Sequence, residues 1–184
     1  MIEELIYFLV GDTTNETSSP VYTALNTLAM LAEMEDIPKV RIYRGQAQGI
    51  SYPYALFYDN GERLPGDRGL GGNAAGNYSE IHVMMVELGA IGRSDIEAKR
   101  RAGYLRLAVE AQLERTKQVG RNALTRFDLG GTQSRDTISN WLIDVRNPEV
   151  RTSGGGLNAN NTTTWTAKSV IRVLVTVNKI RSTI

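Results

Sequence analysis

The stretch Thr164–Asn178 (TWTAKSVIRVLVTVN) carries the clearest strand pattern in the chain. Apolar and small residues occupy every second position, the period at which side chains of a β-strand return to one face. At about 3.3 Å per residue, Thr164–Val177 would span roughly 45 Å. We therefore expect a long strand that projects beyond its sheet as one arm of a hairpin, with Gly154–Gly156 and Asn158–Asn161 near its tip. The residues that share one face are Trp165, Ala167, Ser169, Ile171, Val173, Val175 and Val177.

A strand, a long Gly/Asn/Arg-containing loop and a longer strand occur in this order twice, on either side of one helical stretch. In the first copy, Tyr52–Asp59 leads into a loop over Asn60–Asn77, and Tyr78–Leu88 follows. In the second, Trp141–Asn147 leads through a loop over Pro148–Thr163 into the stretch quoted above. Loops this long inside a domain are usually functional or disordered. Neither carries an obvious catalytic set, so the pattern favours assembly over chemistry.

The strand Tyr78–Leu88 is apolar on both faces, which predicts a central strand covered on both sides. His82, the only histidine, is interpreted as a core or interface residue and not as a metal ligand. Asn60-Gly61 is a strong turn signal after the preceding strand. A further short strand is expected at Lys39–Tyr43.

The best-defined helix begins at Ser94, which forms a capping box with Glu97, and ends at Gly120. Its exposed side is expected to include Arg101, Glu110, Glu114 and Lys117. Its inward stripe comprises Ala98, Ala102, Leu105, Val109, Gln112 and Leu113.

Other elements are expected before and after this helix. Ile2–Val10 is a helical candidate, and a second helix begins with Ser19 as N-cap and Pro20 at its first position and ends at Pro38. Asn122–Leu129 is a possible short strand. Ser134–Asn147 is compatible with helix or strand, and alternation favours a strand at Trp141–Val145. Buried helical positions after Ser19 are Val21, Leu25, Leu28, Leu31 and Ala32.

The composition excludes several classes of site. The 184 residues fit one domain over 1–184, with 1–18 as an N-terminal segment. The absence of cysteine excludes disulfides, thiolate catalysis and Cys-type zinc sites. The Gly-rich Gly69–Ala74 superficially resembles a dinucleotide fingerprint, but a strand follows it where that motif needs a helix. We expect no enzyme activity, no cofactor and no metal. The start shows no signal-peptide pattern and no apolar run is long enough to span a bilayer, so we expect a soluble intracellular product.

Charge is unevenly distributed although the net charge is +1. Residues 1–38 hold seven acids and no Lys or Arg, which gives them a charge of −7. The rest of the chain holds 13 acids and 21 basic residues, which gives it a charge of +8. The segments either present separate solvated faces or bring unlike patches together, within a subunit or between neighbours. Specific nucleic-acid binding is not favoured, because acids are interspersed and no aromatic platform accompanies the basic residues.

In this order of elements, the chain resembles the tail terminator proteins of long-tailed bacteriophages. The residues that carry the resemblance are Tyr52–Phe57 (YPYALF) before an acidic, Gly-containing loop, the aromatic-led strand Tyr78–Leu88, the capped helix from Ser94 and the segment Gly154–Val177. The chain departs from small members in its longer first loop and in Arg121–Asn140, which looks like an insertion.

The resemblance implies an α+β fold, with helices packed on one face of a curved, mainly antiparallel sheet. It also implies a hexameric ring in the virion neck, assembled in the host cytoplasm, that caps the tail tube and offers the head a docking surface. The partners implied are the tail tube protein on one ring face and neck or connector proteins on the other, with a sheath terminus if the tail is contractile. DNA would pass through the ring without specific binding. The alternatives are another head–tail connector, stopper or tail-completion subunit, and, in a different class, a small nucleic-acid or ligand-binding module.

On this hypothesis, six residues are interface candidates. Asp67, Arg68, Arg151 and Asn158 lie in the two long loops. Arg101 and Arg106 would meet an acid from the N-terminal segment of a neighbour. Exposed loops and intrahelical pairing are the alternative explanations for these positions.

Overall fold

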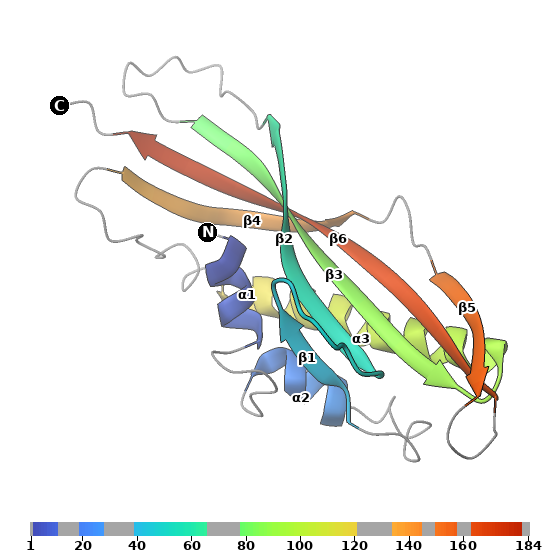
Figure 1. Cartoon of the computed structure of the whole chain (residues 1–184). Coiled ribbons are helices and arrows are strands. Elements are labelled where there is room, and N and C mark those ends of the chain that lie inside the picture. Colours follow the sequence, from blue (N-terminus) through green and yellow to red (C-terminus); the bar gives the residue numbers. More distant parts are fainter. Residues whose placement is uncertain are drawn as a thin grey trace.

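A computed structural model describes residues 2–10, 19–27, 39–65, 78–120, 134–144, 150–157 and 163–181. In this part of the chain, three helices lie against a six-stranded sheet with the order β1-β2-β3-β6-β4, in which β5 also pairs with β6 (Figure 1). Among the described pairs β1–β2 is parallel and the others are antiparallel, so the predicted α+β class with a mainly antiparallel sheet is confirmed. The elements are α1 (Ile2–Val10), α2 (Pro20–Thr27), β1 (Arg41–Arg44), β2 (Tyr54–Pro65), β3 (Tyr78–Gly92), α3 (Asp95–Gly120), β4 (Ser134–Asp144), β5 (Val150–Leu157) and β6 (Thr163–Arg181).

The long C-terminal strand predicted from alternation is confirmed, and it is the axis of the sheet. β6 pairs with β3 along one edge, while β4 and β5 pair with successive halves of its other edge. The prediction of an irregular loop over Pro148–Thr163 is wrong, because Val150–Leu157 forms β5. Its Gly-rich sequence has little intrinsic preference for a strand, but pairing with β6 satisfies its backbone groups.

The prediction that Asn60-Gly61 ends the first strand is also wrong. β2 continues to Pro65, and its register against β3 shifts between Asp59 and Arg63. Gly61 takes a φ of 78° and its N–H donates to Asp59 Oδ1 at 2.8 Å. The turn signal therefore produces a bulge inside a strand, a feature that increases local twist. Residues 66–77 lie outside the described part.

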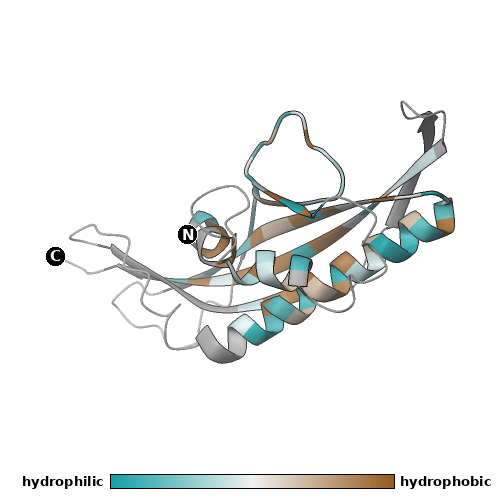
Figure 2. Ribbon diagram, turned by 90° about the horizontal axis from the view of Figure 1, so that it is seen from below, coloured by the Kyte–Doolittle hydropathy of each residue, from teal (hydrophilic) through white to brown (hydrophobic). Residues whose placement is uncertain are grey.

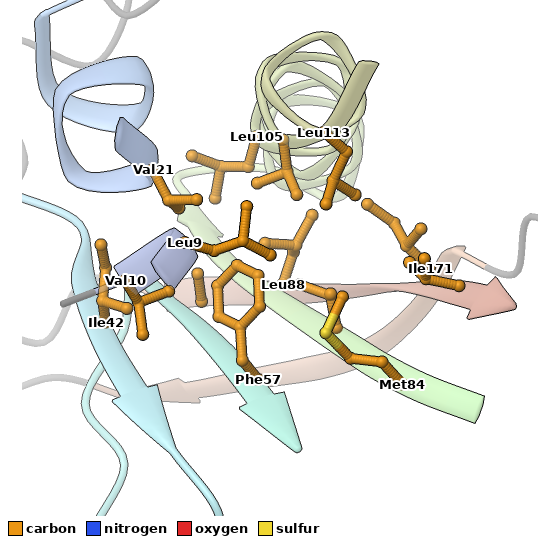
Figure 3. Packing of buried hydrophobic residues seen from close by; sticks show 14 of the residues in the cluster. Leu9, Val10, Val21, Ile42, Phe57, Met84, Leu88, Leu105, Leu113 and Ile171 are labelled. Atoms are coloured by element: carbon orange, nitrogen blue, oxygen red, sulfur yellow. The ribbon is translucent and has the colours of Figure 1, made fainter. Parts of the chain in front are cut away.

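The three helices supply the apolar layer on one face of the sheet (Figure 2), and Figure 3 shows their side chains meeting those of the strands. The strands contribute alternate residues, such as Met84, Val86 and Leu88 of β3 and Ile171 of β6. β3 is central as predicted, and Val83 on the face away from the helices is buried as well, so the expectation of cover on both sides stays a prediction. Its opposite face bears half-buried side chains such as Met85 and no described helix.

The predicted capping box and inward stripe of α3 are confirmed. Ser94 Oγ accepts the Glu97 N–H at 3.1 Å, and Glu97 Oε2 accepts the Arg93 N–H at 2.6 Å. The helix begins close to the end of β3: a Cβ at Gly92 would lie 2.6 Å from the Ala98 backbone nitrogen. Of the predicted stripe, Gln112 is half-buried and the other members are buried: Ala98, Ala102, Leu105, Val109 and Leu113.

The helices α1 and α2 are present where the sequence predicts helices to begin. Ser19 Oγ accepts the Tyr22 N–H at 3.1 Å, as expected of an N-cap. The predicted continuation through Leu28, Leu31 and Ala32 to Pro38 lies outside the described residues, as does Asn122–Leu129. None of the helices in the described part is long and apolar enough to cross a membrane.

Two polar contacts tie the helices to the sheet edges. Asn26 of α2 accepts the Val40 N–H at 2.9 Å and donates to the Val40 carbonyl at 3.3 Å, just before β1. At the other edge, the Trp141 Nε1–H donates to the Leu113 carbonyl at 3.2 Å. Trp141 lies in β4, so the preference for a strand over a helix at Trp141–Val145 is confirmed up to Asp144.

Candidate interaction face

The sheet face away from the helices carries an ordered set of polar and apolar side chains, which we call the open face. Because side chains alternate along strands, the register places its members in rows that cross β2, β3 and β6. One end is aromatic and charged, and the other is aliphatic. The open face comprises Tyr54, Leu56, Tyr58, Val83, Met85, Glu87, Leu142, Lys168, Val170, Arg172 and Leu174.

The aromatic end is organised by Gly89. This residue lies directly opposite Tyr54, and a Cβ on it would come within 2.1 Å of the Tyr54 ring. The ring therefore occupies space over the strand that any other residue would fill. The Tyr43 and Tyr52 rings meet Tyr54 edge-on, with centroids 6.5 Å and 5.0 Å away. Tyr54 is buried by this packing although no described helix covers it.

A charged group lies beside these rings. Glu87 Oε1 accepts hydrogen bonds from the Tyr54 hydroxyl and from Lys168 Nζ, the latter at 2.8 Å. Lys168 Nζ also lies 5.9 Å from the centroid of the Tyr54 ring, within range of a cation–π contact. One carboxylate thus joins three neighbouring strands, since Tyr54 is on β2, Glu87 on β3 and Lys168 on β6.

The pKa values in this group reflect mutual stabilisation. Burial acts to raise the pKa of Glu87, but the hydrogen bonds from Lys168 and Tyr54 and the Lys168 charge lower it below 4.5. The hydrogen bond to Glu87 raises the pKa of Lys168 despite its partial burial. Burial, followed by the Glu87 carboxylate, raises the pKa of Tyr54. Glu87 and Lys168 are therefore held charged and the Tyr54 hydroxyl neutral, which suits a structural contact and gives no general base near neutrality.

The opposite end of the open face is aliphatic. Leu142 of β4, Leu174 of β6 and Val83 of β3 lie in one row, and the Leu142 side chain is 52% exposed. A second cross-strand ion pair borders this row, in which Arg172 donates to Glu62 Oε1 at 2.6 Å. In this row Leu142 is exposed, Leu174 is half-buried and Val83 is buried, and the charge pair borders it on one side, an arrangement that resembles part of a protein-binding surface with a polar rim.

Three of the six predicted interface residues lie in the described part of the chain: Arg101, Arg106 and Arg151. Asp67, Arg68 and Asn158 lie outside the described residues, and Arg151 is in β5 opposite Lys168. Arg106 donates to Glu110 at 2.6 Å, so intrahelical pairing is observed for it. The neighbour's acid proposed for Arg106 stays a prediction.

Arg101 is buried, and the prediction that it lies on the exposed side of the helix is wrong. The sequence places it on the exposed side of α3, but it is 3% exposed, donates to the Ile91 carbonyl at 3.0 Å and pairs with Glu97 at 2.8 Å. Its guanidinium joins the start of α3 to the end of β3. The expectation missed this contact because an arginine among charged residues on a helix usually stays in water.

The open face was not identified from the sequence, although one signal was available. Lys168, Arg172 and Leu174 occupy the alternate positions of β6 that the buried stripe leaves over. Pairing them with Glu87 or Leu142 requires the strand register, which links residues far apart in the chain. In the described part of the chain, no group of three or more His, Asp or Glu residues is arranged to hold a metal ion.

No protein-family model matches the chain, and no curated protein matches it.

Proposed function

We propose that this chain is a structural subunit of a phage tail, which forms a hexameric ring at the end of the tail tube and stops its polymerisation. The observation that carries the proposal is the open face, a sheet surface with an aliphatic row at one end, in which Leu142 is exposed, and with ion pairs along the rest of its length. Such a surface suits protein–protein contact better than chemistry, because its charged groups are already neutralised by one another. The order of elements that resembles tail terminators supports the choice of this assembly.

The open face supplies one side of the contact between neighbouring subunits in this proposal. A contact that uses different surfaces on the two neighbours closes into a ring when the rotation between neighbours equals one full turn divided by the number of subunits. Ring closure leaves no free copy of the contact, so growth ends there. Leu142 and Leu174 provide the apolar part of this contact, and the paired charges fix its orientation.

The test combines light scattering with negative-stain imaging, with and without tubes assembled from the tail tube protein of the same phage. We expect hexameric rings on tube ends, a smaller species when tubes are absent, and shorter tubes when the protein is added during polymerisation. Leu142→Glu should abolish rings, because it places a charge in the aliphatic row. Leu107→Glu on α3 is the matched control, since that leucine is 54% exposed and lies on the helical layer.

A folded subunit that ignores tube ends would overturn the terminator assignment. If that subunit instead binds purified head connectors, the role would be that of a connector or stopper. Rings that persist in Leu142→Glu would show that the open face is not the ring contact.

A further inference from the structure

The outer side of α3 carries a second exposed surface, on the molecular layer opposite the open face. Ile96 and Leu107 are 77% and 54% exposed, the two highest values among the exposed large apolar side chains. They belong to a row spaced alternately by four and three residues, the repeat of helices that pair along a seam. We call this row the α3 seam: Ile96, Arg100, Gly103, Leu107, Glu110 and Glu114.

Gly103 lies in the middle of the α3 seam. A glycine in the interior of a helix makes that helix less stable than an alanine at the same position would. No contact inside the described molecule calls for it, since a Cβ at Gly103 would meet nothing within 4 Å. A glycine at this point lets another helix approach closely and receive a large side chain. Leu107, one turn further along the same face, is such a side chain.

Charge along the α3 seam is directional. Arg100 lies in its first half, and Glu110 and Glu114 lie in its second half. Two copies aligned in parallel would set arginine against arginine and glutamate against glutamate. In antiparallel alignment about position 105, Arg100 of each copy faces Glu110 of the other and Leu107 of each copy faces Gly103. The four central positions of the seam are therefore complementary in this orientation, while at its ends Ile96 faces Glu114, and Glu110 also pairs with Arg106 of its own helix at 2.6 Å.

The geometry points to a second copy of this chain as the partner of the α3 seam, in a two-fold antiparallel helix pair. A two-fold contact uses the same surface on both copies and closes at two subunits. It is distinct from the proposed ring contact and does not depend on it. Since one helix face is smaller than a standard interface, this dimer forms at high protein concentration and dissociates on dilution.

Sedimentation equilibrium over a range of protein concentrations tests whether the dimer exists. We expect a monomer–dimer equilibrium, which Leu107→Glu weakens by at least ~10-fold because it places a charge at the glycine of the partner. The matched control is Leu142→Glu, which should leave the dimer constant within about twofold. A wild-type monomer at every concentration, or equal weakening by both variants, would overturn the proposal.

Engineered cysteines test the orientation, since the chain has none of its own. In the antiparallel pair, Cys at 100 on one copy faces Cys at 110 on the other. The same positions on two copies lie about 15 Å apart along the axis, beyond the reach of a disulfide. A mixture of Arg100→Cys and Glu110→Cys proteins should therefore cross-link under mild oxidation, and each alone should not. Cross-linking within the single variants, or none in the mixture, would overturn the proposed orientation; circular dichroism checks that each variant is folded.

Discussion

Gly89 is the residue on which the aromatic end of the open face depends. Replacing it with alanine sets a methyl group against the Tyr54 ring, which Tyr43, Tyr52 and Glu87 hold on its other sides. Because the ring is buried and is held by these neighbours, we expect Gly89→Ala to lower the free energy of unfolding by about 1–3 kcal/mol. Urea denaturation followed by circular dichroism measures this change.

Gly103→Ala provides the control for this substitution. It makes the same chemical change in open space on a helix, so it should raise the free energy of unfolding by about 0.5–1 kcal/mol. Both proteins are compared at the same low concentration, so that self-association contributes nothing to the difference between them. A Gly89→Ala protein as stable as the wild type would show that the Tyr54 ring yields easily.

The acidic residues of β2 and β3 predict how stability depends on pH. The pKa values of Glu87 and Asp59 are lowered in the folded protein: burial opposes the change, but hydrogen bonds from Lys168 to Glu87 and from Arg63 to Asp59 outweigh it. A lowered folded-state pKa gives stability that is complete above the unfolded-state value and is lost as pH falls through the folded-state value. We expect the free energy of unfolding to decrease below about pH 4.5, the ordinary value for Glu87.

Glu87→Gln tests the share of this effect that belongs to Glu87. The variant should be less stable than the wild type near neutral pH and should lose less stability on acidification, as measured by urea denaturation at several pH values. Lys168 affects stability at the alkaline end of the pH range. Its pKa is raised in the folded protein, so its contribution to the free energy of unfolding is complete below pH 10.5 and is lost at higher pH. An acid dependence unchanged in Glu87→Gln would contradict the assignment.

At the scale of elements, Arg101 joins α3 to β3. Arg101→Met keeps much of the aliphatic volume but removes the donor to the Ile91 carbonyl and leaves Glu97 without its buried partner. We expect a loss of about 2–4 kcal/mol in the free energy of unfolding, because a charge pair is broken inside the protein. Chemical denaturation measures it. Lys99→Met is the matched control: its pair with Asp95 is exposed, and the change should be within about 0.5 kcal/mol.

Elements with strong local signals could be predicted from the sequence. The Ser94 cap, the Ser19–Pro20 helix start and the alternation of Thr164–Asn178 each produced the expected structure, because local hydrogen bonds or a period of two define them. β5 and the bulge at Gly61 could not be predicted, since both result from pairing with distant strands that outweighs local preference.

The open face shows the same difference between what local sequence predicts and what depends on distant strands. Its residues alternate with the core stripe along β6, so their common side was predictable from the sequence. The contacts of Lys168 with Glu87 and of Leu142 with Leu174 were not, because they depend on strand order and register. Arg101 was misassigned for a related reason: its burial comes from the end of β3.

For the whole molecule, the sheet order predicts the distribution of local stability. β3 and β6 are flanked by strands on both edges and covered by α3 on one face, whereas β1 is a four-residue edge strand. Amide hydrogens of Val83–Ala90 and Ile171–Val175 should therefore exchange most slowly and those of Arg41–Arg44 much faster. Hydrogen exchange with mass spectrometry measures both. Equal protection in β1 would mean that this edge is closed by a further contact.

β6 also determines when the sheet is completed during synthesis. Each described strand that pairs with β6 precedes it in the chain, so β3, β4 and β5 leave the ribosome before their shared partner exists. Until then, among the described strands, β3 can pair with β2 alone, and β4 and β5 lack the strand that joins them to the sheet. Pairing over such long separations makes folding slow and leaves apolar strand edges exposed to other chains. Nascent chains are thus most at risk of aggregation just before Thr163–Arg181 emerges, and chaperone demand should be concentrated at that stage of translation.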